Sequence, residues 1–256
     1  LRIPFPKDFA KRLNGRKVMR LWRRAKYIMA DLDDGETLII HLGMSGRMAV
    51  FAKNKSHKLG QFHYDPVPDE PEKHDHVIFD TDAPARVTFN DHRRFGLMTL
   101  IDTDKIETHK LFKDVGVEPL SQDFDAAFLK EALNGKKAPI KSALLDQRLI
   151  AGLGNIYVCE ALWRAKISPK RRASRVKPDE IATLVKAIKD VLQEAVKAGG
   201  SSLRDHKQVH GELGYFQHHF AVYGREKKLC QRADGGIIKR IVQSGRSSFF
   251  CPICQR

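Results

Sequence analysis

The clearest periodic pattern in the chain runs over residues 178–198. Apolar side chains recur there at helical spacing, namely at Ile181, Leu184, Val185, Ile188, Val191, Leu192 and Val196. Pro178 suits the first turn of a helix, and Gly199 and Gly200 follow the last periodic residue. The pattern predicts a long helix that packs by one face and carries no chemistry.

The N-terminal half has short apolar runs bounded by turn residues, which are typical of β-strands. Predicted strands cover residues 18–24, 27–32, 37–41, 77–80, 85–89 and 95–101. They follow a short helix over 8–13, and several such strands favour a β-sandwich. Residues 52–72 are polar and contain three prolines, so we expect a long, mobile surface loop there.

The second half is mostly helical in pattern, with helices expected over residues 124–133, 139–146 and 157–165. Between the last two lies Gly152-Leu153-Gly154-Asn155-Ile156-Tyr157. The glycines permit a tight turn, and Asn155 would stand at a helix start, where free N–H groups attract an anion. Two interpretations remain, a helix–two-turn–helix that grips a DNA phosphate and a plain helix–helix turn with a glycine cap.

The net charge of the chain favours the interpretation in which the turn binds a DNA phosphate. The chain has 46 Lys and Arg against 31 Asp and Glu, a net charge of +15. Such a balance indicates a polyanionic partner, nucleic acid first and an anionic membrane second. No apolar run is long enough to span a membrane, and no signal peptide is evident.

Two turns in the N-terminal half could wedge into a base stack. Met44 would project from the Gly-x-x-Gly turn at residues 41–46, although a methionine at a strand end is more often core. Arg93 and Phe95 point the same way at the tip formed by residues 91–96, where a cation and an aromatic ring could fill a gap in a duplex. The alternative is that Phe95 tucks into the core.

Two further places in this half are basic or imidazole-rich. Lys26 follows Arg23 and Arg24, which suits proton transfer but also an ordinary solvated strand end. His74 and His76 would share one face of a strand, as a metal pair or as phosphate contacts. No third ligand is near, so phosphate contact is the preferred interpretation.

The C-terminal tail has the spacing of a metal site. Cys251-Pro252-Ile253-Cys254 follows a predicted hairpin with strands at 236–240 and 247–250, and Cys230 precedes that hairpin. Asp234 stands where the second cysteine of the first pair is expected. We expect one structural Zn²⁺ held by Cys230, Asp234, Cys251 and Cys254, with a weakened site or no metal as alternatives. The cysteines are too few for a disulfide framework, which fits a reducing cytosol.

Taken together, these residues resemble the formamidopyrimidine-DNA glycosylase family, bacterial enzymes that excise oxidised purines. The likeness covers essentially the whole chain and rests on Arg24 to Tyr27, His41 to Gly46, Lys73 to His76, Asp91 to Gly96, Gly152 to Tyr157, Gly214 to Gln217 and the tail. It implies an α+β multidomain protein. A β-sandwich catalytic domain would cover 1–118, a helix–two-turn–helix DNA-binding domain 119–221, and a zinc-finger hairpin 222–256.

The resemblance also implies roles for individual residues. Lys26 would assist β-elimination, and Arg246 would serve δ-elimination. The residues matching DNA-binding positions are His74, Arg93, Lys137 and Asn155 at phosphates or the opposite strand, Met44, Arg93 and Phe95 in the gap left by the everted nucleotide, and Arg204 in the loop over the flipped base. The partner would be duplex DNA with an oxidised purine or an abasic site, bound by a monomer in the bacterial cytoplasm.

One departure from the family stands at the N-terminus. The family begins with Pro-Glu, whose proline amine is the nucleophile, whereas this chain begins with Leu1. We therefore expect the N-terminal catalytic segment to be missing and the chain as given to lack that nucleophile. Two alternative functions follow, a non-catalytic protein that binds damaged DNA and an endonuclease VIII-like glycosylase for oxidised pyrimidines.

Overall fold

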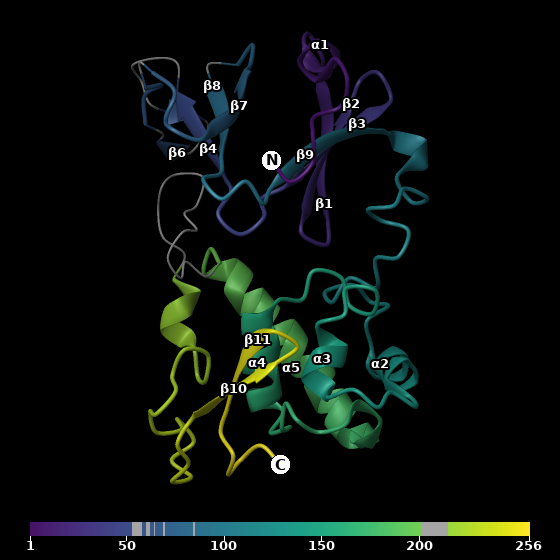
Figure 1. The fold of residues 1–256 in the computed structure, drawn as a ribbon, viewed down its shortest axis with the longest axis vertical. Helices are drawn as coiled ribbons and strands as arrows, with labels where there is room; N and C mark the ends of the chain where they lie inside the picture. Colours follow the sequence, from purple (N-terminus) through teal and green to yellow (C-terminus); the bar gives the residue numbers. More distant parts are fainter. Residues whose placement is uncertain (53–57, 60–61, 64, 69, 84, 201–214) are drawn as a thin grey trace. The chain divides into compact units, whose positions relative to one another are not determined.

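The computed structural model of this chain describes residues 1–52, 58–59, 62–63, 65–68, 70–83, 85–200 and 215–256 (Figure 1). The chain forms two compact units. The first comprises Leu1–Thr108 with Ala198–Gln217, and the second comprises His109–Lys197 with His218–Arg256. Arg204, which is predicted to contact the flipped base, lies outside the described residues, as do parts of the loop expected over 52–72.

The first unit is built from two antiparallel sheets after a short helix, α1 (Phe9–Leu13). One sheet has the order β1-β2-β3-β9 and the other the order β4-β8-β7. The strands of the first are β1 (Val18–Arg24), β2 (Tyr27–Leu32), β3 (Glu36–His41) and β9 (Leu97–Asp102). Those of the second are β4 (Arg47–Ala52), β7 (Asp75–Asp80) and β8 (Ala85–Asn90).

Both sheets contribute to a single apolar core, which makes this unit a β-sandwich as predicted. Buried residues from β2, β3, β8 and β9 form the core, and partly buried side chains of β4 and β7 pack against it. Phe89 of β8 and Met98 of β9 are both completely buried there.

Two features of this unit were not predicted. Strand β4 follows the glycine turn directly, where the sequence pattern indicated only a turn and a loop. The small ladder of β5 (Lys58–Leu59) and β6 (Phe62–His63) lies within the range expected to be a loop. Both were missed because these segments are too short to show a clear period in the sequence. They become strands through pairing with a neighbouring strand.

The second unit is helical and ends in a hairpin. Its helices are α2 (Ala126–Leu133), α3 (Ile140–Leu144), α4 (Asn155–Arg164) and α5 (Pro178–Lys197), close to the predicted ranges. A 3₁₀ turn, η2 (Ala173–Arg175), also belongs to this unit, whereas η1 (Thr103–Lys105) follows β9 in the first unit and η3 (Phe216–His219) spans the boundary between the two. The hairpin of β10 (Lys239–Gln243) and β11 (Arg246–Phe250) lies beside α4 (Figure 1). No helix among the described residues combines the length and apolar character needed to cross a membrane.

A buried carboxylate joins α4 to the segment that leads into the hairpin. Both oxygens of Glu160 accept backbone N–H groups, from Ala221 at 2.9 Å, Val222 at 3.0 Å and Tyr223 at 2.9 Å. Burial raises the pKa of Glu160, and the three N–H donors oppose that rise. The hairpin is therefore attached to the helical unit before its strands begin.

The first hairpin strand was predicted three residues too early. It covers Lys239–Gln243 rather than 236–240, and Gln243 pairs with Arg246 across a two-residue turn. Both turn residues, Ser244 and Gly245, have positive φ, at 48° and 71°, as a tight hairpin turn requires. Residues near 236 form part of the cysteine loop instead, because Cys230 donates its backbone N–H to the Gly236 carbonyl at 2.7 Å.

Candidate nucleic-acid interface and metal centre

A buried carboxylate holds two loops of the β-sandwich together. Asp91 is fully buried and accepts a hydrogen bond from Ser45 Oγ at 2.5 Å and another from the Gly96 N–H at 2.7 Å. A Cβ atom on Gly43 would meet the Gly96 nitrogen at 2.6 Å, so the backbones approach as closely as glycine permits. The loops at 41–46 and 91–96 therefore form one rigid surface.

This surface presents the three predicted wedge residues to solvent. Met44 is 64% exposed and Phe95 is 45% exposed, which excludes the alternative that either side chain is core. Arg93 is exposed as well, and its guanidinium lies over the Phe95 ring, 4.8 Å from the centroid. Two apolar side chains and one cation thus stand on adjoining loops.

The prediction that His74 and His76 share one strand face is wrong. His74 precedes β7 and has a φ of 79°, and the strand register shifts between Asp75 and Val77. His76 is partly buried, with its Nε2 at 2.8 Å from the Asp91 carbonyl oxygen. His74 is half-buried instead beside His92, with 6.4 Å between ring centroids. Strand alternation fails here because the chain turns at His74.

Lys26 lies exposed in the turn between β1 and β2. Ala25 has a φ of 52°, and its carbonyl accepts Arg23 Nη1 at 2.7 Å, which holds the turn. His41, at the end of β3, lies close enough to Lys26 for the lysine charge to affect the pKa of the imidazole. Burial, Arg2 and Lys26 lower the pKa of His41 to about 4, so its imidazole is neutral at pH 7.

The glycine turn before α4 has the predicted form. Gly152 has a φ of 72°, and α4 begins at Asn155 without a side-chain cap. Gln147 braces the turn, because its Oε1 accepts the Gly152 N–H at 2.9 Å and its Nε2 donates to the Leu153 carbonyl at 3.1 Å. The first-turn N–H groups of α4 are thus held in a fixed loop, an arrangement that suits an anion.

Two side chains converge on the base of the hairpin turn. The carbonyl oxygen of Ser247 accepts hydrogen bonds from Asn155 Nδ2 at 2.9 Å and from Lys141 Nζ at 2.9 Å. Lys141 is fully buried in α3 and also donates to Ser248 Oγ at 2.7 Å. Arg246, one residue before Ser247, is exposed at the start of β11. The helices therefore fix the strand from which Arg246 projects.

The side chains of Asn155 and Lys137 differ in their accessibility to a ligand. The Asn155 amide nitrogen is committed to Ser247, and its Oδ1 is buried without a hydrogen-bond partner among the described residues. Lys137 is exposed between α2 and α3, on a segment whose neighbouring carbonyls at Lys136 and Ala138 accept N–H groups from Ser174 and Ala173.

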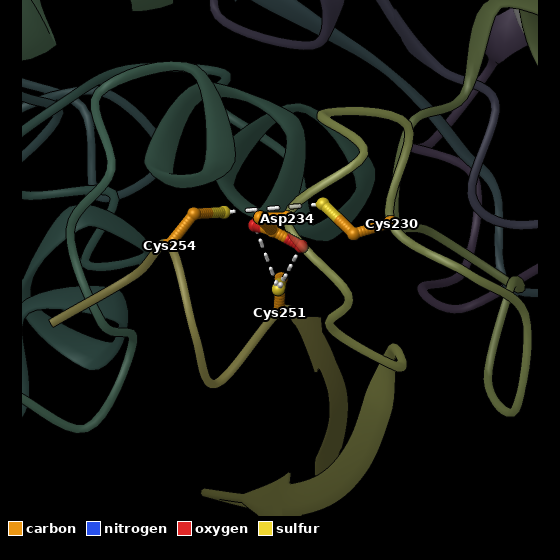
Figure 2. Close-up of side chains that lie close together, drawn as sticks. All are labelled: Cys230, Asp234, Cys251 and Cys254. Atoms are coloured by element: carbon orange, nitrogen blue, oxygen red, sulfur yellow. Dashed lines mark hydrogen bonds between the residues drawn. The ribbon is translucent and has the colours of Figure 1, made fainter.

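The predicted metal ligands lie together (Figure 2). One donor atom from each of Cys230, Asp234, Cys251 and Cys254 lies within 4.8 Å of all the others. Cys230 Sγ and Cys254 Sγ are 3.9 Å apart, close to the roughly 3.8 Å that two thiolates 2.3 Å from one tetrahedral Zn²⁺ would show. Cys251 Sγ lies 3.5 Å from Asp234 Oδ2. The donor set and its spacing fit a tetrahedral divalent metal.

The loop around this cluster is closely packed. A Cβ on Gly236 would collide with Cys251 Sγ, so only glycine fits there. Cys251 donates its backbone N–H to Gln255 Oε1 at 2.8 Å, and Gln255 Nε2 donates to the Ile167 carbonyl at 2.9 Å. Burial raises the pKa of the Cys251 and Cys254 thiols, so metal binding would release their protons.

Two family models match this chain, one in each half. The model of the formamidopyrimidine-DNA glycosylase N-terminal domain matches residues 1–98, and the model of the H2TH domain of the same enzymes matches residues 115–207. The chain belongs to the formamidopyrimidine-DNA glycosylase family. It is a DNA glycosylase, and this enzyme class acts in base excision repair. The N-terminal match starts at residue 1, so the expected loss of an N-terminal segment is not borne out.

Individual relatives agree with the family. The chain is 59% identical to the formamidopyrimidine-DNA glycosylase of Jannaschia sp. (strain CCS1), over 100% of this chain and 89% of that protein. It is also 59% identical to that of Roseobacter denitrificans, with the same coverage. The structure is similar to that of Lactococcus lactis Fpg in complex with DNA containing an abasic site. The TM-score is 0.84 at 35% identity, over 97% of this chain and 86% of that one.

Proposed function

We propose that this glycosylase binds duplex DNA at an oxidised purine, such as 8-oxoguanine or a formamidopyrimidine, removes the base, and cleaves the strand as an AP lyase. The net charge of +15 suits a polyanionic partner. Complexes of Lactococcus lactis Fpg with DNA containing Fapy-dG or an abasic site support this substrate class. We expect it to act as a monomer in the bacterial cytoplasm.

One observation carries the proposal, namely the exposed trio on the loops that Asp91 joins. Extruding a nucleotide costs a few kcal/mol and leaves a gap in the stack. Met44 and Phe95 are apolar wedges of suitable size, and Arg93 adds a cation beside them. A rigid wedge loses little entropy when it enters the duplex, so it offsets more of the extrusion cost.

The chemistry would use an amine that attacks C1′ of the sugar, breaks the glycosidic bond and leaves an imine. Loss of a C2′ proton then breaks the bond from C3′ to oxygen, and a second elimination breaks the bond from C5′ to oxygen. We assign Lys26 to assist the first elimination. Arg246 would bind the phosphate that leaves in the second, because a guanidinium makes bidentate contacts to phosphate.

Other residues would hold the DNA. We assign phosphate or opposite-strand contacts to His74, Lys137, Asn155 and Arg93, and contact with the flipped base to Arg204. Asn155 would act mainly through the uncapped start of α4, since its side-chain nitrogen is bonded to Ser247. The functional division into 1–118, 119–221 and 222–256 is part of this proposal.

We also propose that the cysteine cluster binds one Zn²⁺ through Cys230, Asp234, Cys251 and Cys254. A structural zinc ion would supply folding energy to a hairpin too short for a core of its own. Its role would be to hold the turn with Arg246, without taking part in the reaction.

The test is product analysis on a duplex with one 8-oxoguanine. The protein should release the base and leave a one-nucleotide gap, whereas Arg246→Ala should still release the base but accumulate the β-elimination end. Borohydride trapping followed by peptide mapping identifies the attacking amine. Release of the base with identical strand ends from both proteins would contradict the role of Arg246, and release of no base would contradict glycosylase action on this lesion.

A second candidate is an enzyme for oxidised pyrimidines. A complex of wild-type Lactococcus lactis Fpg with DNA containing an oxidised pyrimidine favours it, with a TM-score of 0.82 at 35% identity. Cleavage rates on thymine glycol and 8-oxoguanine duplexes separate the two.

A further inference from the structure

The C-terminal end of α4 contacts the cysteine cluster through one indole. Trp163 Nε1–H points at Cys230 Sγ, with 3.5 Å between the nitrogen and the sulfur. Trp163 is half-buried and packs against a buried group that includes Cys159, Phe249 and Cys251. The indole N–H is a donor only, so this contact has one direction, from helix to sulfur.

Arg232 clamps the same loop to the same turn of helix. Its guanidinium lies over the Trp163 ring, 4.3 Å from the centroid. Its Nη2 donates to the carbonyls of Trp163 at 3.0 Å and Arg164 at 3.1 Å, which are among the last carbonyls of α4. Arg232 stands between Cys230 and Asp234 in the chain, so both proposed ligands of that loop are tied to α4.

The charge of a loaded site explains why such donors matter. Three thiolates and one carboxylate around Zn²⁺ sum to a net charge of about −2, counting two positive against four negative charges. A thiolate accepts a hydrogen bond more strongly than a thiol does, since charge-assisted bonds are the stronger class. The indole N–H and the guanidinium would therefore stabilise the metal-bound form more than the metal-free form.

We propose that Trp163 is a positioning residue of the metal centre, which holds the Cys230 thiolate by its indole N–H while Arg232 seals the loop against the end of α4. The inference rests on the proposed metal site. It couples metal occupancy to α4, whose other end bears Asn155 and so reaches the strand that carries Arg246. Loss of a hydrogen bond to a metal ligand typically costs 10- to 100-fold in metal affinity.

The test compares two matched variants of the full chain. Trp163→Phe keeps an aromatic ring but removes the donor, and Trp22→Phe is the control. The chain has two tryptophans, and Trp22 donates to Asp31 Oδ1 at 2.9 Å within the β-sandwich unit. Zinc affinity, measured by competition with a chromogenic chelator, should fall about 10- to 100-fold in Trp163→Phe and stay within about twofold in Trp22→Phe.

A second measurement needs no variant and so cannot fail through misfolding. In proton–nitrogen NMR of the wild-type protein, cadmium loading should move the Trp163 indole signal downfield and slow its exchange with water. The Trp22 indole signal should not respond.

Unchanged zinc affinity in a folded Trp163→Phe, or an indole signal indifferent to cadmium, would overturn the inference. Absence of any metal binding by the wild-type protein would instead overturn the proposed metal site itself. The two failures are distinguishable. If only the role of Trp163 is wrong, Trp22→Phe still binds zinc and cadmium, whereas if the metal site is wrong, Trp22→Phe binds neither.

Discussion

The buried ammonium of Lys141 donates a hydrogen bond of 2.9 Å to the carbonyl oxygen of Ser247. The two residues lie 106 positions apart in the chain, and the bond joins α3 to the strand that begins with Arg246. Burial is the main cause that lowers the pKa of Lys141, and nearby Arg246 lowers it further. Removing a cation from water costs free energy, so we expect a buried lysine to have a structural role. Here Lys141 anchors the turn that carries Arg246.

We therefore predict that Lys141→Met impairs the elimination step assigned to Arg246. Loosening an anchor can misplace a reacting group by about 1 Å, which costs up to 10²-fold, so the δ-elimination product should fall about tenfold or more. Base release should fall much less. The measurement is the ratio of β- to δ-elimination ends on an abasic duplex.

Lys189→Met is the matched control, because Lys189 Nζ also donates to a backbone carbonyl, that of Ser121, at 3.0 Å and away from the hairpin. It should leave the product ratio unchanged. An unchanged ratio in a folded, metal-loaded Lys141→Met protein would show that Ser247 needs only Asn155.

A second prediction concerns the carboxylate under the wedge surface. Asp91→Ala leaves Ser45 Oγ and the Gly96 N–H buried without their acceptor. We expect a loss of about 2–4 kcal/mol in the free energy of unfolding, measured with urea. Binding to a duplex with a tetrahydrofuran abasic analogue should weaken as well, because Met44 and Phe95 lose their common support.

Asp82→Ala is the control for that change. Asp82 is exposed and accepts the N–H of Ala83 at 2.9 Å, so its replacement should change the free energy of unfolding by no more than about 0.5 kcal/mol. Equal stability of the two variants would argue against Asp91 as the element that joins the loops.

The third prediction tests the carboxylate ligand. Asp234→Cys completes a four-thiolate set, which soft Zn²⁺-type sites favour, and should slow zinc loss to a chelator by about tenfold or more. Asp234→Ala should speed it. If Asp234→Cys and the wild-type protein lost zinc at the same rate, Asp234 would not be a ligand.

The fourth prediction is a pH dependence. The folded-state pKa of His41 is about 4, below its ordinary value of 6.5, because burial and the charges of Arg2 and Lys26 disfavour the cation. Between these values the unfolded chain binds a proton that the folded chain does not. The stability linked to His41 is thus present above pH 6.5 and is lost as pH falls toward 4.

Since His41 is partly exposed, we expect this loss to amount to about 1–2 kcal/mol after solvent screening. Urea unfolding at pH 7.5 and pH 4.5 measures it, and His41→Gln should remove that part of the difference. His92→Gln, on an exposed turn, is the control and should leave the difference as it is in the wild type. A His41→Gln protein as acid-sensitive as the wild type would contradict the assignment.

Local patterns in the sequence determined much of this molecule. The stripe from Ile181 onward predicts α5 because helix periodicity is a property of neighbouring residues. The strands of the β-sandwich and the start of α4 at Asn155 were predicted in the same way, because a few adjacent residues determine a turn or a helix start. Cysteine spacing likewise indicated the cluster, including Asp234 at the place of a missing thiol.

Tertiary structure alone decided which polar side chains hold these parts together. The hydrogen-bond partners of these side chains are far away in the sequence, at 46 positions for Asp91, 106 for Lys141, 61 for Glu160 and 67 for Trp163. No local sequence pattern predicts such pairs. In sequence, Lys141 is one more basic residue of a basic chain, yet it is fully buried. Burial decides its role, because a polar group taken out of water must find its hydrogen-bond partner wherever the fold brings one.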